Sequence, residues 1–294
     1  MNFAIITDST SDLCNELREK YNIDYVAMNY VIDGVEYPAM LDWSSHSPKE
    51  LYNFMRNGKH ITTTQVPRAS YVEKFTEYLE KGLDVLYISC SSALSGSFNL
   101  STLIAKELEA EYPDRKIYCA DSLISSLGQG SIVIKAAELR NEGKTVSEVF
   151  DYVIENRLKY NQFGTVDNLE YLKRAGRIKA SKAFFGNIFG VKPIIISDII
   201  GQNYAFKKAK GALNAKNAIA DEMAAVVENP EEQILYISHA DDEESAIQLK
   251  DIIMEKIPFA GFNIGYIAPI VGSSVGPGTI IAFCRGKEVT IKGE

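Results

Sequence analysis

An apolar stretch that ends in a run of hydroxyl side chains is the feature that most restricts the fold of this chain. Residues 83–90 have the pattern of a buried strand, and residues 91–97 follow directly as Ser-Ser-Ala-Leu-Ser-Gly-Ser. A helical pattern over 97–112 and a further strand pattern over 116–120 complete a βαβ unit, which requires parallel strands. Open α/β sheets bind ligands at the carboxyl ends of their strands. We therefore expect the hydroxyl run to lie at a binding edge.

Two further segments are rich in hydroxyl groups or glycine. Thr62-Thr63-Thr64-Gln65 precedes a predicted helix start, and residues 272–278, Gly-Ser-Ser-Val-Gly-Pro-Gly, are expected to form a loop between two late strands. Hydroxyl groups can donate to a carboxylate without carrying charge, and glycine lets backbone N–H groups approach it. Any one of these residues could simply cap a helix or a turn. The three segments together indicate a site for a small anionic or polar head group.

The length and the strand patterns predict two α/β domains. A chain of 294 residues that is 46% hydrophobic can bury a substantial core and exceeds the usual size of one domain. From Phe163 onward the pattern changes, and a hairpin signal at 201–203 implies antiparallel pairing. We expect an N-terminal parallel-sheet α/β domain over residues 1–160 and a C-terminal α/β domain with a mixed sheet over 161–294.

Charge and hydropathy restrict the partners. The net charge of −8 argues against nucleic acid and against anionic lipid surfaces. No uninterrupted apolar run approaches the ~18 residues of a membrane span, and the N-terminus turns polar too soon for a signal peptide. These features predict a cytoplasmic protein without stable membrane insertion. The four cysteines are far apart and lack a C-x-x-C pair, so we expect free, buried thiols.

Local signals predict several element boundaries. Asp33-Gly34 is a hairpin signal because both turn positions favour positive φ. Capping boxes predict helix starts, and other patterns predict a helix after Thr10 or Ser11, a helix over about 131–141 and a short helix near Ala183. The capping boxes are Ser47 to Glu50, Ser70 to Glu73 and Thr145 to Glu148.

No motif in the chain predicts a catalytic centre. Residues 272–276 match G-x-S-x-G, but a hydrolase of that type needs a histidine later in the chain, and His46, His60 and His239 all come earlier. The chain has no G-x-x-x-x-G-K-[ST] phosphate-binding loop, and its histidines lack metal-ligand spacing. We therefore predict neither a catalytic residue nor a metal site.

Several short segments, taken in order, resemble the DegV family, fatty-acid-binding proteins that serve as lipid carriers for bacterial fatty acid kinase. Each segment is short, but their order runs along nearly the whole chain. The matching segments are Ile6 to Thr10, Thr63-Thr64-Gln65, Ser92 to Ser97, Asp121-Ser122, Leu169 to Ile178, Val191 to Ile194 and Gly276-Pro277-Gly278.

The resemblance implies a lipid-binding protein that is not itself an enzyme. It implies that Thr63, Ser95 and the Gly96 amide bind a fatty acid carboxylate, with the acyl chain in an apolar tunnel between the domains. The hydroxyl segments add four candidate ligand-binding residues, Thr62, Thr64, Ser92 and Ser274. The resemblance also implies a fatty acid kinase partner, which would supply the ATP and Mg²⁺, so that this chain needs no cofactor. Arg177 would dock that partner or meet the phosphoryl group; the alternative is a surface ion pair.

The chain departs from the family pattern at three positions. Ser274 stands where the family has histidine, Ala175 replaces a glycine, and Val66 stands where many members have proline. Serine retains a neutral donor but removes a group that could carry positive charge near the carboxylate. Two alternatives stay open. The serine density and the G-x-S-x-G match leave open a lipid esterase with Ser95 or Ser274 as nucleophile, and Ser274 in place of histidine leaves open a carrier of another apolar carboxylic acid without a kinase.

Overall fold

The computed structural model describes residues 3–179 and 190–293 of the chain. The strands are β1 (Phe3–Asp8), β2 (Ile23–Val26), β3 (Asn29–Ile32), β4 (Val35–Pro38), β5 (Ile61–Thr64), β6 (Asp84–Ser89), β7 (Ile117–Asp121), β8 (Tyr160–Thr165), β9 (Val191–Ser197), β10 (Asn203–Lys210), β11 (Ile234–His239), β12 (Gly261–Tyr266) and β13 (Ile280–Arg285). The α-helices are α1 (Asn15–Tyr21), α2 (Pro48–Arg56), α3 (Arg68–Glu80), α4 (Ser97–Glu111), α5 (Ser126–Asn141), α6 (Val146–Asn156), α7 (Leu169–Ala175), α8 (Ala212–Val226), α9 (Glu243–Lys256) and α10 (Pro269–Val275). Short 3₁₀ helices occupy η1 (Arg157–Lys159) and η3 (Pro230–Glu232).

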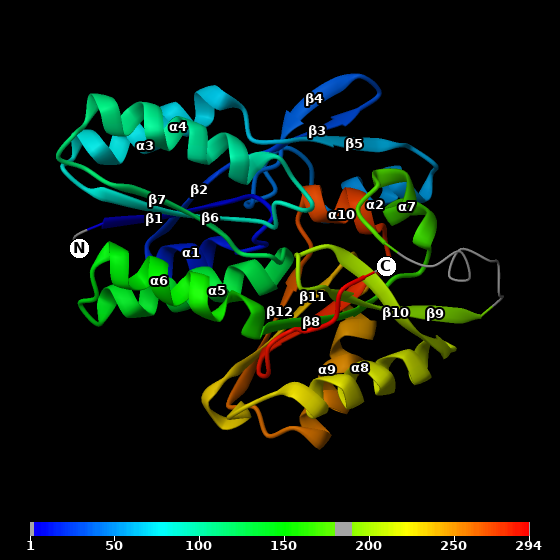
Figure 1. Ribbon diagram of the computed structural model, residues 1–294. Helices are drawn as coiled ribbons and strands as arrows, with labels where there is room; N and C mark the ends of the chain where they lie inside the picture. Colours follow the sequence, from blue (N-terminus) through cyan, green and yellow to red (C-terminus); the bar gives the residue numbers. More distant parts are fainter. Residues whose placement is uncertain (1–2, 180–189, 294) are drawn as a thin grey trace.

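A parallel sheet with the strand order β2-β1-β6-β7 forms the N-terminal part. Helices α3 and α4 cover one face, and α1, α5 and α6 cover the other (Figure 1). All six residues of β1 are buried, as expected for a strand covered on both faces. The predicted parallel α/β arrangement is confirmed, and the carboxyl ends of β1, β6 and β7 lie at one edge.

A small antiparallel sheet with the order β4-β3-β5 stands beside this edge. The predicted hairpin at Asp33-Gly34 is present, with φ of 52° and 83°. The threonine run precedes helix α3, as predicted, but it is not a loop: Thr62 to Thr64 belong to β5, where Thr63 pairs with Tyr30. Threonine is β-branched and suits a strand of this kind, in which Ile61 is buried and the threonines are exposed or half-buried.

A mixed sheet with the order β10-β9-β8-β13-β11-β12 forms the C-terminal part. Strands β9 and β10 form the predicted antiparallel hairpin, whereas β11 and β12 are parallel. Helices α8 and α9 cover one face of this sheet, and α5 packs against the other face while also packing against β1 and β6 (Figure 1). The new sheet begins at Tyr160, next to the predicted boundary, but the division into two domains at that point stays a prediction.

Several expected helix boundaries differ in the structure. The capping boxes at Ser47 and Thr145 are confirmed, whereas α3 begins at Arg68 after Pro67, which places Ser70 inside the first turn. Helix α1 begins at Asn15 rather than after Thr10 or Ser11, and its N-cap Cys14 is exposed, not buried as expected. The helix expected near Ala183 lies outside the described residues.

Helix α5 begins at Ser126, five residues before the expected start. Gly128 and Gly130 lie inside its first turns, where their lack of a side chain allows close packing. A Cβ at Gly128 would lie 2.8 Å from the ring of Phe283, and one at Gly130 would lie 2.7 Å from the Ser11 carbonyl oxygen. These glycines let α5 lie between the two large sheets.

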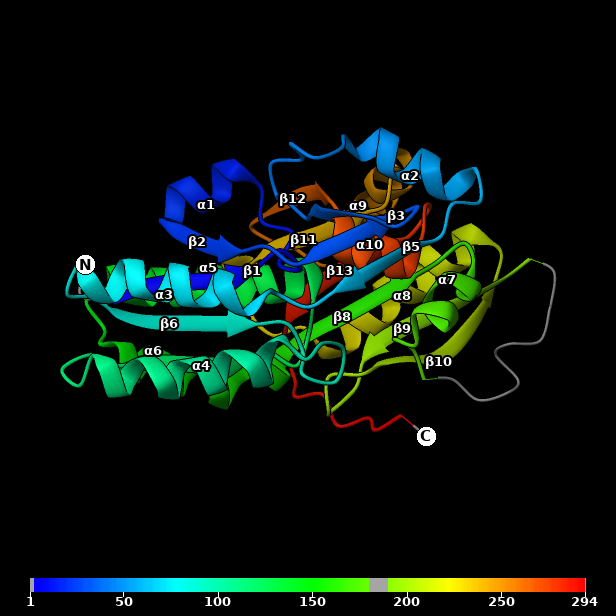
Figure 2. The ribbon, with the colours of Figure 1, turned by 90° about the horizontal axis from the view of Figure 1, so that it is seen from above.

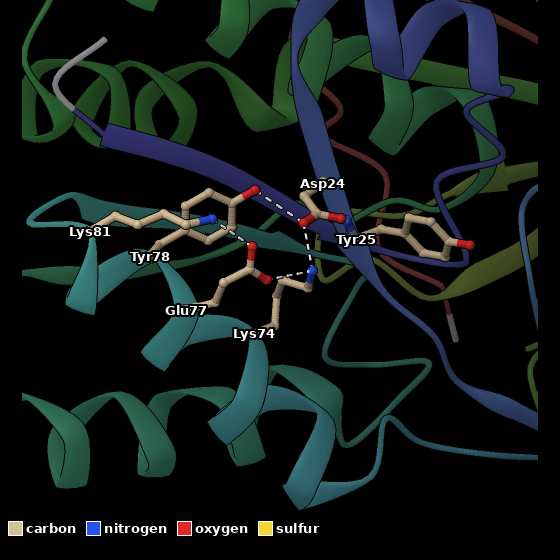
Figure 3. A network of polar contacts seen from close by, with 6 residues as sticks. All are labelled: Asp24, Tyr25, Lys74, Glu77, Tyr78 and Lys81. Carbon is tan, nitrogen blue, oxygen red and sulfur yellow. Dashed lines mark hydrogen bonds and ion pairs between the residues drawn. The ribbon is translucent and has the colours of Figure 1, made fainter.

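A polar network holds α3 against β2 at the side of the parallel sheet (Figure 3). The Asp24 carboxylate accepts from Lys74 Nζ at 2.7 Å and from the Tyr78 hydroxyl at 3.0 Å, and Glu77 joins Lys74 to Lys81. Burial, followed by the Asp24 charge, raises the pKa of Tyr78 to about 12, so this phenol stays a neutral donor. Among residues 3–179 and 190–293, no helix combines the length and apolar character needed to cross a bilayer.

Candidate ligand-binding cavity

A cavity of about 200 Å³, here called the central cavity, lies where the small sheet, the edge of the parallel sheet and α10 meet. Figure 2 shows α10 beside β3 and β5, with α7 close by, and these elements pack against one another. Within residues 3–179 and 190–293, no aspartate or glutamate lines the cavity. Its residues are Thr10, Met28, Thr63, Thr64, Gln65, Cys90, Leu94, Ser95, Gly96, Ser125, Leu172, Arg177, Asn203, Ile270, Val271, Ser274 and Val275.

The N-terminus of α4 supplies one wall of the central cavity. Ser95 Oγ lies 3.0 Å from Ser97 Oγ and accepts from the Ser97 N–H at 3.2 Å, which fixes the turn before the helix. The Gly96 N–H, by contrast, has no hydrogen-bond partner in the described part of the chain. Free N–H groups and the positive end of a helix dipole favour an anion at this position.

The buried carboxylate of Asp8 lies behind this wall. It accepts from the Thr10 N–H at 3.0 Å, the Tyr87 hydroxyl at 2.9 Å and the Cys90 N–H at 3.1 Å. Gln129 Nε2 adds a contact at 3.3 Å. Donors within the protein thus hydrogen-bond to the Asp8 carboxylate. These bonds also fix the positions of Thr10 and Cys90, which face the cavity.

Strand β5 supplies the opposite wall, with Thr63, Thr64 and then Gln65. The Gln65 amide approaches Gly96 so closely that a Cβ on residue 96 would collide with Gln65 Oε1. The Gln65 side chain thus packs directly on Gly96 and joins the end of β5 to the turn before α4. This close approach explains why two segments thirty residues apart face one cavity.

The segment that contains Ser274 was expected to be a loop, and this expectation is wrong. Residues 269–275 form helix α10, which starts at Pro269 and ends before Gly276 at a φ of 82°. A Cβ at Gly272 would lie 3.0 Å from the Tyr52 ring, so glycine allows α10 to pack on α2. Ser274 lies in the last turn, and its Oγ donates to the Ile270 carbonyl at 3.4 Å.

The structure brings most of the predicted site residues together. Thr63, Thr64, Ser95, Gly96, Ser274 and Arg177 all line the central cavity. Thr62 lines a neighbouring cavity instead. Ser92 lines neither of these two cavities, and its N–H donates to Asp121 at 3.1 Å.

Sequence reasoning missed Thr10, Ser125 and Asn203, which also face the central cavity. Thr10 follows β1 in the same way that the hydroxyl run follows β6, and Ser125 directly precedes α5 as Gly96 precedes α4. Both therefore had the sequence signal of a polar residue between a strand and the next helix. Asn203 lies at the start of β10, and its signal was only that of a turn.

A narrow apolar space of about 20 Å³, the inner cavity, continues the central cavity toward the six-stranded sheet. Ser125, Leu172, Asn203, Val271 and Val275 line both spaces. The remaining lining comes from β8 and the residue after it, from β9, and from β13 and the residue before it; Gly164, Val166, Ile195 and Ile281 are nonpolar, and Gln162, Thr165 and Thr279 are polar. The path from β5 inward therefore changes from polar to mainly apolar.

Thr63, Arg177 and Ser274 also line a second cavity of about 150 Å³, here called the outer cavity because its basic residues are exposed. These basic residues are Lys59, His60, Arg174 and Arg177, and among the described residues no aspartate or glutamate lines the space. Arg177 is exposed and donates to the carbonyls of Leu94 at 3.0 Å and Ala175 at 2.5 Å. In the part of the chain that the structure describes, Arg177 forms no ion pair, which disfavours that alternative for its role.

The potential nucleophiles in the cavities are not activated. Burial, together with the Asp8 charge, raises the pKa of Cys90 well above its ordinary value, so this thiol is neutral. Ser95 and Ser274 hydrogen-bond within their own segments, and no histidine in residues 3–179 and 190–293 hydrogen-bonds to either one. Within the same ranges, no group of three or more His, Cys, Asp or Glu side chains is placed to hold a metal ion.

Comparison with known proteins gives consistent matches over nearly the whole chain. The model of the DegV family, described as a family of uncharacterised proteins, matches residues 2–285. A DegV domain-containing protein of Clostridium perfringens is 37% identical over 284 residues, which cover 97% of each chain. The solved structure of a fatty-acid-binding DegV family protein from Thermus thermophilus has a TM-score of 0.88 and 27% identity, covering 98% of this chain and 100% of that one.

A second solved structure, of a DegV family protein from Ruminococcus gnavus with vaccenic acid, has a TM-score of 0.86 and 25% identity, and covers 96% of this chain and 99% of that one. The family model and the relative match nearly the whole sequence, and both solved structures share the fold over nearly its whole length. This chain belongs to the DegV family.

Proposed function

We propose that this protein binds a long-chain fatty acid in the central and inner cavities and presents its carboxylate to an ATP-dependent fatty acid kinase. One observation carries the binding proposal: Thr63 of β5, Ser95 and Gly96 before α4, and apolar side chains of α7 and α10 converge on a single cavity. The protein itself then performs no chemistry.

The polar end of the central cavity suits a carboxylate. The free Gly96 N–H, the α4 dipole and neighbouring hydroxyls offer donors, and the lining has no carboxylate that would repel the ligand. Each hydrogen bond to a charged acceptor contributes about 2 kcal/mol. This end therefore orients the ligand.

The apolar end suits an acyl chain and supplies most of the affinity. Burying one methylene contributes about 0.8 kcal/mol, so a tail of about fifteen contributes on the order of 12 kcal/mol before association costs. Solved DegV relatives with fatty acid support this arrangement.

The binding proposal is tested by mass spectrometry of organic extracts from natively purified protein. We expect a long-chain acid in near-stoichiometric amount, and uptake of added octadecanoic acid by delipidated protein. A protein that carries no such acid and takes up none would contradict the proposal.

The outer cavity supports the kinase part of the proposal. Its four basic side chains stand beside Thr63 and Ser274, where a bound carboxylate would point outward. An exposed arginine there suits phosphate geometry, so Arg177 is placed to meet an acidic partner surface or a phosphoryl group. The partner would bring ATP and Mg²⁺, and the proposed location of the pair is the cytoplasm.

This part is tested with a bacterial fatty acid kinase, ATP and the loaded protein, with any acyl phosphate trapped by hydroxylamine. We expect Arg177→Ala to reduce acyl phosphate formation at least tenfold when the variant and the wild-type protein are both fully loaded with the acid, which removes any effect of this cavity-lining residue on fatty acid binding. Ser274→His restores the residue type of the family pattern and should raise the rate if a positive charge near the carboxylate is required. A loaded protein that no kinase phosphorylates would instead be a carrier without a kinase.

The esterase alternative finds no support in the cavity geometry. His60 lines the outer cavity together with Ser274, but the Ser274 hydroxyl donates to the Ile270 carbonyl and not to this histidine. The Ser95 hydroxyl donates to Ser97 Oγ. A serine-reactive fluorophosphonate probe should leave both serines unlabelled. Labelling at either serine would reopen the alternative.

A further inference from the structure

Polar side chains interrupt the otherwise apolar wall of the inner cavity. Gln162 of β8 is only 5% exposed, Ser125 is 8% exposed and Asn203 is 9% exposed, and all three line this space. Its apolar wall consists of Val166, Leu172, Ile195, Val271, Val275 and Ile281. Thr165 and Thr279 also line the space, so a tail made only of methylenes would meet five polar residues among the apolar ones.

The strand pleat directs Gln162 into this space. Successive side chains of a strand point to opposite faces. Phe163 packs with the cluster of α8 and α9, so its neighbours Gln162 and Gly164 face the opposite side, where the inner cavity lies.

The hydrogen-bonding capacity of these groups is only partly used. Gln162 Nε2 donates to Asn203 Oδ1 at 3.1 Å, and Asn203 Nδ2 donates to the Arg177 carbonyl at 3.0 Å. A glutamine amide has two N–H donors and an oxygen with two acceptor positions. Among the described residues, no hydrogen bond joins Gln162 Oε1 or the Ser125 hydroxyl to another group, and Ser125 makes no side-chain cap to α5. Thr165 Oγ1, in the same lining, is also buried without a partner.

A buried polar group without a partner is unfavourable, and a ligand that supplies the partner is bound more tightly than one that does not. The position of these groups also matters. Ser125 and Asn203 line both the central and the inner cavity, so they lie along the path of the acyl chain and beyond the carboxylate end at Gly96. A ligand group that hydrogen-bonds to these residues must therefore be attached to the acyl chain, away from the carboxylate.

We propose that the preferred ligand is a long-chain acid with a hydroxyl group along its chain, which donates to Gln162 Oε1 and accepts from the Ser125 hydroxyl. This inference rests on the proposed fatty acid binding and specifies its ligand class. One buried water could satisfy the same groups, since a cavity of this size holds about one. In that case the protein would not favour the hydroxylated chain.

The test compares octadecanoic acid with a series of hydroxyoctadecanoic acids that differ only in the position of the hydroxyl. Affinities for delipidated, full-length protein are measured by isothermal titration calorimetry. We expect at least one positional isomer to bind about tenfold more tightly than octadecanoic acid. If every isomer binds equally or more weakly, the hydroxyl inference is wrong while fatty acid binding stands; if no acid binds at all, the proposed function itself fails.

Two variants assign the preference to its residues. Gln162→Met keeps an unbranched side chain of similar length and removes the amide, and Ser125→Ala removes only the hydroxyl. Each should reduce the affinity ratio of the best isomer to octadecanoic acid by about fivefold or more, whereas a buried water would leave the ratio unchanged.

The matched control is Gln202→Met, because Gln202 is also buried, at 9% exposed, but lines none of the three cavities. It should leave the ratio unchanged. Using the ratio within one variant separates ligand preference from any general loss of stability. An equal change in Gln202→Met and Gln162→Met would contradict the assignment.

Discussion

The two faces of the six-stranded sheet differ in the groups that pack against them. The face toward α8 and α9 is apolar and packs into one cluster with those helices; its strand residues include Phe163, Ile194, Ile196, Leu235, Ile237, Ile280 and Ala282. The opposite face meets α5, α10 and the N-terminal part, and mixes apolar with buried polar residues, among them Gln162, Ile195, Ser197, Asn203, Ser238 and Ile281.

The difference separates the residues that stabilise the fold from those that bind. The chain itself fills the space between the sheet and α8 and α9. On the other face it leaves the central and inner cavities, bounded by segments from distant parts of the sequence. We infer that a ligand completes this second face, and the following predictions test the contrast from the largest expected effect to the smallest.

Shortening the ligand should have the largest effect. Octanoic acid has eight methylenes fewer than hexadecanoic acid, which removes about 6 kcal/mol of burial before compensation. We expect its affinity to be lower by at least about a thousandfold in titration calorimetry, with the carboxylate contacts unchanged. Affinities within tenfold of each other would mean that the mixed face does not take up the tail.

The second prediction concerns Asp12, a buried carboxylate on the mixed side. It accepts from Ser126 Oγ and from the Ala268 N–H at 2.9 Å, and Ser126 also contacts Ser238 of β11 at 2.9 Å. Asp12 thus links the loop after β1 to the C-terminal part. Burial raises its pKa from 3.8 to about 7, against the two hydrogen bonds that favour the charged form.

The folded protein therefore binds this proton more tightly than the unfolded chain, so stability from Asp12 is present at low pH and is lost as pH rises through about 7. At 1.36 kcal/mol per pKa unit the loss is about 4 kcal/mol. The free energy of unfolding of the Asp12→Asn variant lacks this loss. The difference in free energy of unfolding, variant minus wild type, should therefore rise by about 4 kcal/mol from pH 4 to pH 8, as measured by urea denaturation. Parallel pH profiles for the two proteins would contradict the raised pKa.

The third prediction uses two adjacent isoleucines of β9 as a matched pair. Ile196 packs with α8 and α9, and Ile195 lines the inner cavity. Ile196→Ala should lower the free energy of unfolding by about 3 kcal/mol and leave fatty acid affinity within twofold.

Ile195→Ala should lower stability less, because part of its side chain already borders empty space, and should change affinity for long acids more. Chemical denaturation and calorimetry of both variants measure the two effects. If both substitutions change stability and affinity by equal amounts, the two faces do not divide these roles.

The sequence predicted the fold well where the signals were local. The strand at 83–90, the hairpin at Asp33 and the capping box at Ser47 each depend on a few neighbouring residues, and all three are present. Ser95 and Gly96 were found because they follow the clearest apolar strand.

The parts that sequence reasoning missed depend on contacts between distant segments. Residues 269–275 contain a glycine and two serines, which have low helix propensity, yet packing against α2, α7 and β5 makes them helical. Gln162 and Asn203 became site candidates only when the pairing of β8, β9 and β10 placed both beside Ser125.

The smallest effect is expected at the polar end of the central cavity. Ser95 and Thr63 are partly exposed, so removing their hydroxyls should lower the free energy of unfolding by only about 1 kcal/mol, chiefly because Ser95 Oγ no longer accepts from the Ser97 N–H at the start of α4. In the double variant Ser95→Ala, Thr63→Ala, we expect about a 30-fold loss of affinity for hexadecanoic acid, since each of the two lost hydrogen bonds at this partly exposed end contributes about 1 kcal/mol. The matched ligand is hexadecan-1-ol, which keeps the tail and lacks the charge. Its affinity should change less than that of the acid, because the tail contacts on the mixed face are retained, and an equal change for both ligands would show that these hydroxyls do not recognise the carboxylate.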